Sequence, residues 1–315
     1  MNILIAMAAM FFAACVGPEI PQDTVPTVKG GVKFAGIRSS YYGFADSTGK
    51  WETSNFPTPE EAATVMKNIS KKFDDAVPSA VWIVGGIHGK ECRLEFEQTQ
   101  TNDPYIKFAN QDKHTPYLNK FDEIGAKVYL QIEAGRANMK ELIRLVLDKY
   151  SHHPSVAGFG IDVEWYPSDG DTNGPDEEVD EKLNTNDLIE FEALVKSYNP
   201  DYKIFVKHYN AAYVGGKPVG DVVYINDSYG FSGVNAFASE FANWANMFYP
   251  NEVGFQIGYA GDGNTDYAWW SKLENPMEEM VKAINKKMKN KDQVINVYWV
   301  DFTIRWKEFD ELWKK

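Results

Sequence analysis

Cysteine and histidine are scarce in this sequence. The 315 residues include two cysteines, Cys15 and Cys92, and five histidines. No histidines stand at the spacing that zinc sites use, so we expect no zinc centre. Cys15 belongs to an N-terminal segment described below, which leaves Cys92 without an intramolecular partner. We therefore expect no internal disulfide, and a fold that its hydrophobic core must stabilise.

Basic charge and long apolar runs are scarce as well. The chain has 32 Lys and Arg against 45 Asp and Glu, a formal net charge of -13, and its basic residues form no long cluster. Phosphate backbones require such a cluster, so nucleic acid is excluded as an expected partner. The apolar run at the N-terminus is too short to form a membrane-spanning helix.

Aromatic residues, in contrast, are plentiful. They make up 14% of the chain and include nine tryptophans, within a hydrophobic fraction of 44% that is ordinary for a globular protein. Aromatic rings fill cores and also stack on the faces of sugars. The composition alone favours the core.

The N-terminal segment has the features of an export signal. Residues 1–15, "MNILIAMAAMFFAAC", are apolar and end in small residues and a cysteine, followed by a Pro-containing polar stretch at 16–30. The ending "FAAC" resembles the lipobox of bacterial lipoproteins, in which Cys15 becomes the lipidated first residue. We expect an exported cell-envelope lipoprotein, periplasmic or on the cell surface, that contacts the membrane only through its lipid. A cleaved signal without lipidation is the alternative, because the run has no Lys or Arg near its start.

Eight short β-rich apolar segments recur after residue 30. They are separated by polar stretches, several of which have helical periodicity, and this alternation is typical of a parallel sheet. The predicted strands are 32–37, 80–86, 126–135, 156–165, 203–209, 221–227, 252–259 and 295–302.

Three of the intervening helices are well marked. From Thr58, a Pro at the next position and Glu61 three residues on form a capping-box pattern. The segments 138–150 and 186–198 both place apolar residues on one face and are followed by Pro154 and Pro200.

Eight strands with crossover helices predict a single α/β domain, a (β/α)8 TIM barrel over residues 31–315. The fifth crossover is the exception, since only about a dozen residues separate His208 from Asp221 and they include "VGGKPVG". We expect that helix to be missing or vestigial. Nothing indicates a second domain or a repeat, and we expect a monomer.

The segment "GFGIDVEWYP" carries the candidate catalytic residues, Asp162 and Glu164. In such barrels the site lies at the C-terminal ends of the strands. Side chains alternate along a strand, so both carboxyl groups are predicted to face inward together. Repulsion and partial burial should then raise the pKa of one and leave the other ionised. The alternative is that they only pair with buried Lys or Arg.

Other predicted strand ends supply polar residues that converge on the same place. We predict substrate-binding roles for Tyr129, Gln131, Glu133, Asn226, Asp227, Gln256, Trp299 and Asp301. Lys207 and His208 are adjacent on the fifth strand, so only one of them faces the barrel, and the sequence leaves open which one.

A loop after the fourth strand is the one candidate metal site. Asp169, Asp171, Asn173 and Asp180 match ligand positions of a D-x-D-x-N-G calcium loop. Pro175 departs from the pattern, and an acidic, solvated loop is the commoner explanation. We expect no cofactor.

The third and fourth strands resemble those of family 18 glycoside hydrolases, the chitinases and endo-β-N-acetylglucosaminidases. "GAKVYLQIEAG", a helix, and then "AGFGIDVEWYP" are similar to the family's "GxKxxxSxGG" strand, helix and "DGxDxDxE" motif. Gly158 then matches the family glycine, while Ala157 and Gly160 replace the first two aspartates. "VVYIND", "VGFQIGYAG" and Trp299 in "VYWVDF" resemble the later strands, and the short fifth crossover is similar to that of the endo-β-N-acetylglucosaminidase branch.

The resemblance implies hydrolysis of N-acetylglucosamine-containing glycans, either chitin-like chains or N-glycans. In the family's substrate-assisted retaining mechanism, Glu164 protonates the glycosidic oxygen and later activates water. Asp162 orients the acetamide, and Asn226 or Asp227 binds its oxygen or a neighbouring group. The missing aspartates put control of the Asp162 pKa in question.

Two alternatives stay open. A shifted alignment places Asp162 and Glu164 on the family's second and third aspartates and Tyr166 on the acid, which implies no catalysis. The chain would then be a surface glycan-binding barrel. A muramidase resembling family 25 lysozymes is the second, although "VKFAGIRSS" lacks the strand-one aspartate that this family implies.

Overall fold

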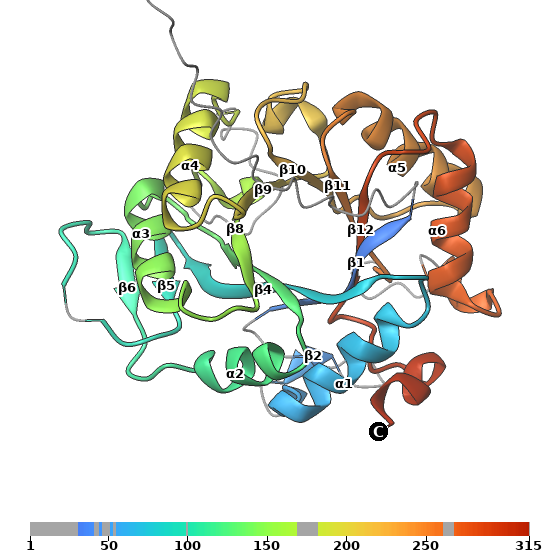
Figure 1. The fold of residues 1–315 in the computed structure, drawn as a ribbon, viewed down its shortest axis with the longest axis horizontal. Coiled ribbons are helices and arrows are strands. Elements are labelled where there is room, and N and C mark those ends of the chain that lie inside the picture. Colours follow the sequence, from blue (N-terminus) through green and yellow to red (C-terminus); the bar gives the residue numbers. More distant parts are fainter. Residues whose placement is uncertain are drawn as a thin grey trace, which may run out of the picture.

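Eight parallel strands of the described chain close into a barrel with helices packed around it (Figure 1). The computed structural model describes residues 31–40, 44–45, 51–52, 55–98, 100–168, 182–260 and 268–314. The first strand pairs with the last barrel strand on one side and with the next on the other, which closes the sheet. The barrel strands are β1 (Val32–Ser39), β4 (Val77–His88), β7 (Lys127–Ile132), β8 (Val156–Asp162), β9 (Lys203–Lys207), β10 (Val223–Asn226), β11 (Val253–Ile257) and β12 (Ile295–Val300).

The predicted (β/α)8 barrel is thereby confirmed, including its irregular fifth crossover. Between β9 and β10 the chain forms only a 3-10 helix, η3 (Ala211–Val214), before Gly215, Gly216 and Pro218 interrupt it. The helices are α1 (Pro59–Ser70), α2 (Thr115–Glu123), α3 (Met139–Tyr150), α4 (Thr185–Tyr198), α5 (Val234–Phe248) and α6 (Pro276–Lys287).

The predicted start of α1 is confirmed in atomic detail. The Thr58 hydroxyl accepts a hydrogen bond from the Glu61 N–H at 3.2 Å, and the Glu61 carboxylate accepts one from the Thr58 N–H at 2.8 Å. Two N-terminal donors without helical partners are thus satisfied. Helix α3 likewise begins at an Asn138 cap, as its sequence pattern indicates.

Several short elements are additions that the sequence does not predict. β5 (Glu91–Leu94) pairs antiparallel with the end of β4, and β6 (Ile106–Phe108) pairs with β5, so this extension lies outside the closed barrel (Figure 1). A small hairpin consists of β2 (Phe44–Ala45) and β3 (Trp51–Glu52). The remaining 3-10 helices are η2 (Val163–Trp165), η5 (Trp269–Lys272) and η6 (Lys307–Trp313).

The barrel interior has an apolar layer with a polar layer above it. The apolar layer comprises Phe34, Val81, Tyr129, Phe205, Val223, Ile225 and Tyr298. On four of these strands, the side chains two or four residues further along, towards the C-terminal ends, are also turned inward by alternation and are polar. These are Arg38 on β1, Gln131 on β7, Lys207 on β9 and Asp227 just after β10. The polar layer forms the mouth of the barrel.

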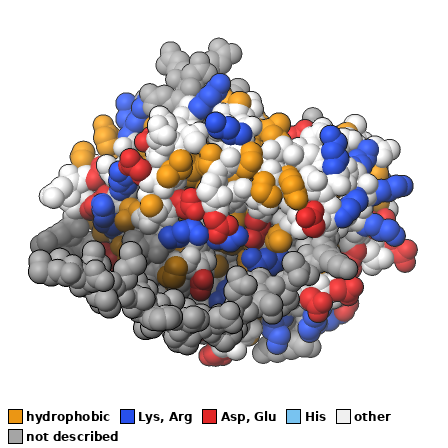
Figure 2. Space-filling view, turned by 45° about the horizontal axis from the view of Figure 1, so that its top comes forward, with side chains coloured by type: hydrophobic (Ala, Val, Ile, Leu, Met, Phe, Trp, Pro, Cys, Tyr) orange, Lys and Arg blue, Asp and Glu red, His pale blue; other side chains and the backbone are white. Residues whose placement is uncertain are grey.

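Basic and acidic side chains are interspersed on the face shown in Figure 2. Neither sign has that face to itself, which agrees with the lack of a basic cluster in the sequence. None of the helices described is both long and apolar enough to cross a membrane. Residues 1–30, with Cys15, and the proposed calcium ligands Asp169, Asp171, Asn173 and Asp180 lie outside the described residues.

Candidate active site

The candidate catalytic pair lies where β8 ends, at the mouth of the barrel. The strand ends at Asp162, earlier than the predicted 165, and Glu164 lies in η2. A hydrogen bond from the Gly135 N–H to the Trp165 carbonyl, 2.8 Å long, ties this turn to the segment after β7. The expectation that strand alternation turns both carboxyl groups inward was therefore wrong for Glu164, whose position depends on a turn.

Asp162 is buried, with 1% of its surface exposed, and has two hydrogen-bond donors. Its Oδ2 accepts a hydrogen bond from Gln131 Nε2 at 3.2 Å and lies 2.9 Å from Lys207 Nζ. Asp162 and Lys207 are also register partners on adjacent strands. The alternative prediction, that Asp162 pairs with a buried cation, is therefore correct for one of its two oxygens, Oδ2. Its Oδ1 is buried and has no partner among the described residues.

The structure decides which residue of the Lys207 and His208 pair faces the barrel. Lys207 points inward and contacts both Asp162 and Asp227. His208 stacks on Tyr213, with ring centroids 4.5 Å apart, and its Nδ1 accepts a hydrogen bond from the Asn210 N–H. Burial lowers the pKa of His208 to about 4, so the ring is neutral near pH 7.

Glu164 differs from Asp162 in being exposed and without a donor. The described residues offer it no hydrogen bond or ion pair, although Lys207, Asp227 and Glu133 lie close enough to interact with its charge. The walls of the mouth remove water from the carboxyl group and raise its pKa above the ordinary value. Lys207 opposes this shift, and Asp227 and Glu133 add to it.

Burial likewise raises the pKa of Asp162, against the opposing charge of Lys207. The group of charges at the mouth is acidic: Glu133, Asp162, Glu164, Asp227 and Asp301 face Arg38 and Lys207. Five acids against two cations leave an excess of three negative charges if all are ionised, which favours retention of a proton. Burial raises the pKa of both Asp162 and Glu164, so the retained proton belongs to this pair, and the two donors of Asp162 favour its ionised form.

Arg38, on β1, is a second buried cation at the mouth, and it was not among the residues predicted from the sequence. Its Nη1 donates a hydrogen bond to Asp301 Oδ1 at 3.0 Å, and Asp301 Oδ2 accepts one from the Ser40 N–H. Burial disfavours the charged guanidinium, yet Asp301 and the other acids raise its pKa overall. The alternation of side chains along β1 could have identified Arg38, because it lies four residues after the inward-facing Phe34.

Four predicted binding residues join this group. Gln131 contacts Asp162, and Asp227 contacts Lys207. Glu133 accepts a hydrogen bond from the Ile87 N–H at 3.2 Å, and Gln256 accepts one from the Tyr259 hydroxyl at 3.2 Å. Asp301, the fifth, contributes to the mouth only indirectly, through its ion pair with Arg38.

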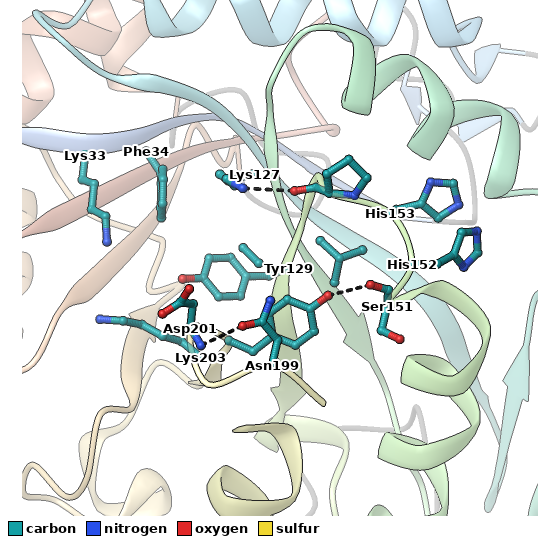
Figure 3. Close-up of a pocket in the computed structure, with 14 residues that line it drawn as sticks. Lys33, Phe34, Lys127, Tyr129, Ser151, His152, His153, Asn199, Asp201 and Lys203 are labelled. Carbon is teal, nitrogen blue, oxygen red and sulfur yellow. Dashed lines mark hydrogen bonds between the residues drawn. The ribbon is translucent and has the colours of Figure 1, made fainter. Parts of the chain in front are cut away.

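The structure does not place Tyr129 at the mouth. Tyr129 belongs to the apolar layer and lines a cavity of about 430 Å³ at the opposite end of the barrel (Figure 3). Lys33 and Lys203 also line this cavity, and both are paired with Glu252. Tyr129 faces inward as predicted, but it lies two residues before Gln131 on β7, in the apolar layer and not in the polar layer.

Asn226 and Trp299 face away from the mouth, which corrects their predicted roles. The Asn226 amide donates to Glu240 of α5 and accepts from the Ser228 N–H. Trp299 is 0% exposed and packs between Trp270 and Phe309, so it presents no ring face to a ligand. Both side chains point outward because their inward neighbours on the strands are Ile225 and Tyr298.

A row of aromatic rings that was not predicted from the sequence extends from the mouth. Phe302, Tyr259 and Tyr229 follow β12, β11 and β10, with ring centroids 5.5 Å and 5.6 Å apart. Arg38 lies over the Phe302 ring, and Tyr229 is 54% exposed. We call these three residues the aromatic row. They stand in loops after three different strands, so no sequence spacing links them.

Unpartnered buried polar atoms gather at the mouth. Among the described residues, Asp162 Oδ1, Asp227 Oδ1, Gln131 Oε1, Gln256 Nε2 and Arg38 Nε have no hydrogen-bond partner. Buried polar groups are normally satisfied, so a cluster of such atoms calls for a polar partner. The site therefore offers both acceptors and donors to a ligand.

The structure gives a reason for one of the two positions at which acids of the family motif are missing, Gly160. A Cβ at Gly160 would lie 2.1 Å from the ring of Phe205, which fills the barrel interior at that level. Ala157 lies at the other end of β8 and packs against the apolar layer. An acid at position 160 would therefore collide with an aromatic ring.

No protein-family model matches the sequence, and the comparison with curated proteins finds no match. Within the described residues, no cluster of His, Cys, Asp and Glu has the geometry of a metal site. Cys92 is a buried free thiol, and burial raises its pKa. The candidate site therefore rests on its own geometry.

Proposed function

We propose that this protein is a glycoside hydrolase that cleaves N-acetylglucosamine-containing glycans by substrate-assisted retaining hydrolysis. One observation carries the proposal. Asp162 presents an unpartnered, buried acceptor oxygen beside Glu164, an exposed carboxyl group whose pKa is raised. Substrate-assisted hydrolysis needs such a pair, with one group to orient the acetamide and one to donate a proton.

In this mechanism Glu164 protonates the glycosidic oxygen as the acetamide oxygen attacks the anomeric carbon. Asp162 Oδ1 accepts the acetamide N–H and stabilises the positive charge that develops on the acetamide. Glu164, now ionised, removes a proton from the water that opens the intermediate. The anomeric configuration is retained because the carbon is attacked twice.

The aromatic row supports a saccharide as the ligand. Aromatic rings stack on the apolar faces of sugars, and the row leads from beside Arg38 outward to the exposed Tyr229. The polar atoms at the mouth supply hydrogen bonds to hydroxyl and amide groups. An exported protein with a lipid at Cys15 would meet such glycans outside the cytoplasm.

The test compares the full chain with Glu164→Gln. Chitooligosaccharides, high-mannose and complex N-glycans, and peptidoglycan are incubated with each protein, and released saccharides are measured. Loss of the general acid should lower kcat by about 10² to 10⁴. Glu190→Gln, which removes an exposed carboxylate of α4 that pairs with Lys140, is the matched control and should leave turnover unchanged.

The outcomes separate the alternatives. Turnover that persists in Glu164→Gln contradicts the assignment of the acid. Binding by both proteins without turnover favours a surface glycan-binding barrel. Cleavage of peptidoglycan alone favours a muramidase.

A further inference from the structure

Lys207 occupies the centre of the polar layer. It is 3% exposed, and its Nζ lies 2.9 Å from Asp162 Oδ2 and also contacts Asp227 Oδ2. A buried ammonium group is costly unless it is paired, and here two carboxylates share it. Burial disfavours the charged form, but Asp162 and Asp227 outweigh it and hold the pKa of Lys207 well above its ordinary value. Lys207 is therefore a permanent cation.

The contacts of Lys207 fix the orientation of both carboxylates. Each uses its Oδ2 on the ammonium group, and each has an Oδ1 that is buried and unpartnered among the described residues. Both free oxygens are thus acceptors that remain for a ligand. The charged and titratable groups around Lys207 come from several elements: Asp162 at the end of β8, Glu164 after it, Asp227 after β10, Tyr259 after β11 and the adjacent His208. Glu133 after β7 and Arg38 on β1 lie near Asp162 and Glu164.

We propose that Lys207 is the positioning residue of the site, which turns one oxygen of Asp162 and one of Asp227 towards the substrate and whose positive charge favours the ionised form of Asp162. This inference rests on the proposed hydrolase function. Lys207 touches the reacting groups only through Asp162 and Asp227, so it acts by orientation and charge.

The neighbouring strand explains how this arrangement is built. Gly160 and Asp162 on β8 are register partners of Phe205 and Lys207 on β9. Phe205 fills the space above Gly160, and Lys207 supplies the charge opposite Asp162. The family pattern has acids behind Asp162 that this sequence lacks, and β9 places an aromatic ring and a cation there instead.

Removal of the Lys207 charge should shift the pKa of both neighbouring acids in one direction. Lys207 lowers the pKa of Asp162 and of Glu164, so a neutral residue at 207 raises both. Activity requires an ionised Asp162 and a protonated Glu164, and the bell-shaped pH profile should therefore move to higher pH on both limbs. A carboxyl group with a raised folded-state pKa costs stability once the unfolded-state group has ionised. The cost is absent at low pH and grows as the pH rises above about 4.

The experiment uses Lys207→Met, Lys207→Arg and Lys203→Met in the full chain. Lys203 is the control because it lies on the same strand, at the other end of the barrel, paired with Glu252 and Asp221. With a chitooligosaccharide that the wild type cleaves, Lys207→Met should lower kcat/KM at pH 6 by about a hundredfold and shift both limbs upward. Lys207→Arg should recover part of the loss and the original limbs, and Lys203→Met should keep the wild-type profile. An unshifted profile in Lys207→Met would overturn the proposal.

A second measurement does not depend on activity. Urea midpoints of wild type and Lys207→Met are compared between pH 4.5 and pH 8, and the gap between them should widen as the pH rises. If the single variant does not fold, Lys207→Met with Asp227→Asn, which removes one of the two carboxylates, takes its place. A gap that stays constant with pH rejects the charge role. A widening gap in a protein that cleaves no glycan supports the role of Lys207 while the hydrolase proposal fails.

Discussion

At the scale of single residues, the two acids at the end of β8 have opposite surroundings. Asp162 is buried between Gln131 and Lys207, whereas Glu164 is exposed and has no donor among the described residues. Donors stabilise an ionised carboxylate, whereas a carboxyl group that has no donors and is partly shielded from water has a raised pKa. The two groups therefore suit two roles, although they are the same functional group and only two residues apart.

A substitution at Gly160 tests why the motif lacks its middle acid. Gly160→Ala adds a Cβ 2.1 Å from the Phe205 ring, and this overpacking should cost about 1 to 3 kcal/mol of unfolding free energy. Phe205→Leu makes room, so the double variant should lose less than the sum of the two single losses. Urea unfolding of the four proteins measures the coupling. Strict additivity would show that the ring does not exclude an acid at position 160.

At the scale of elements, the ends of the strands and the turns after them build the site. Strand alternation turns Gln131 and Lys207 inward, while Glu164 and the aromatic row reach the mouth from turns and loops. The barrel strands are short, and most residues on both of their faces are apolar. Their sequences therefore lack the regular alternation of polar and apolar residues that would show which side chains point into the barrel. This is why Asn226 and Trp299 were predicted at the mouth and lie outside it.

The aromatic row predicts a dependence on glycan length. Tyr229→Ala removes the outermost, exposed ring, so it should leave stability nearly unchanged and weaken binding of a long chitooligosaccharide about fivefold. Binding of a disaccharide, which can cover fewer of the three rings than a long chain, should change less. Glycan affinity is measured by calorimetric titration in a Glu164→Gln background, to which each tyrosine substitution is added. This background prevents hydrolysis of the glycan during the titration. Tyr105→Ala, an exposed tyrosine beside β6, is the control, and an equal loss for both glycan lengths would contradict the row.

At the scale of the whole molecule, barrel closure brings together residues from both ends of the chain. β1 pairs with β12 and with β4, and this places Arg38 against Asp301 across 263 positions. At Gly36 the two backbones approach so closely that a Cβ would lie 1.7 Å from the Ser79 carbonyl oxygen. Closure therefore depends on the absence of a side chain at this position.

Gly36→Ala should separate β1 from β4 and open the barrel. The expected loss of unfolding free energy is about 3 kcal/mol or more, among the largest for a single substitution. Urea unfolding followed by circular dichroism measures it, and Lys282→Ala on the exposed face of α6 should show almost no change. A wild-type midpoint for Gly36→Ala would mean that the two strands are not in close contact.

The sequence by itself determined the features that depend on neighbouring residues. Apolar segments, caps and the Gly-rich fifth connection predicted the eight strands, the helices from Thr58, Asn138 and Asn186, and the missing fifth crossover helix. They also placed Asp162 at a strand end. Only the tertiary structure decided that Lys207 faces inward, that Phe205 fills the space above Gly160, and that Arg38 joins the mouth. These outcomes depend on which distant strands pair, and in what register, because a side chain's partners across a barrel are set by closure of the sheet.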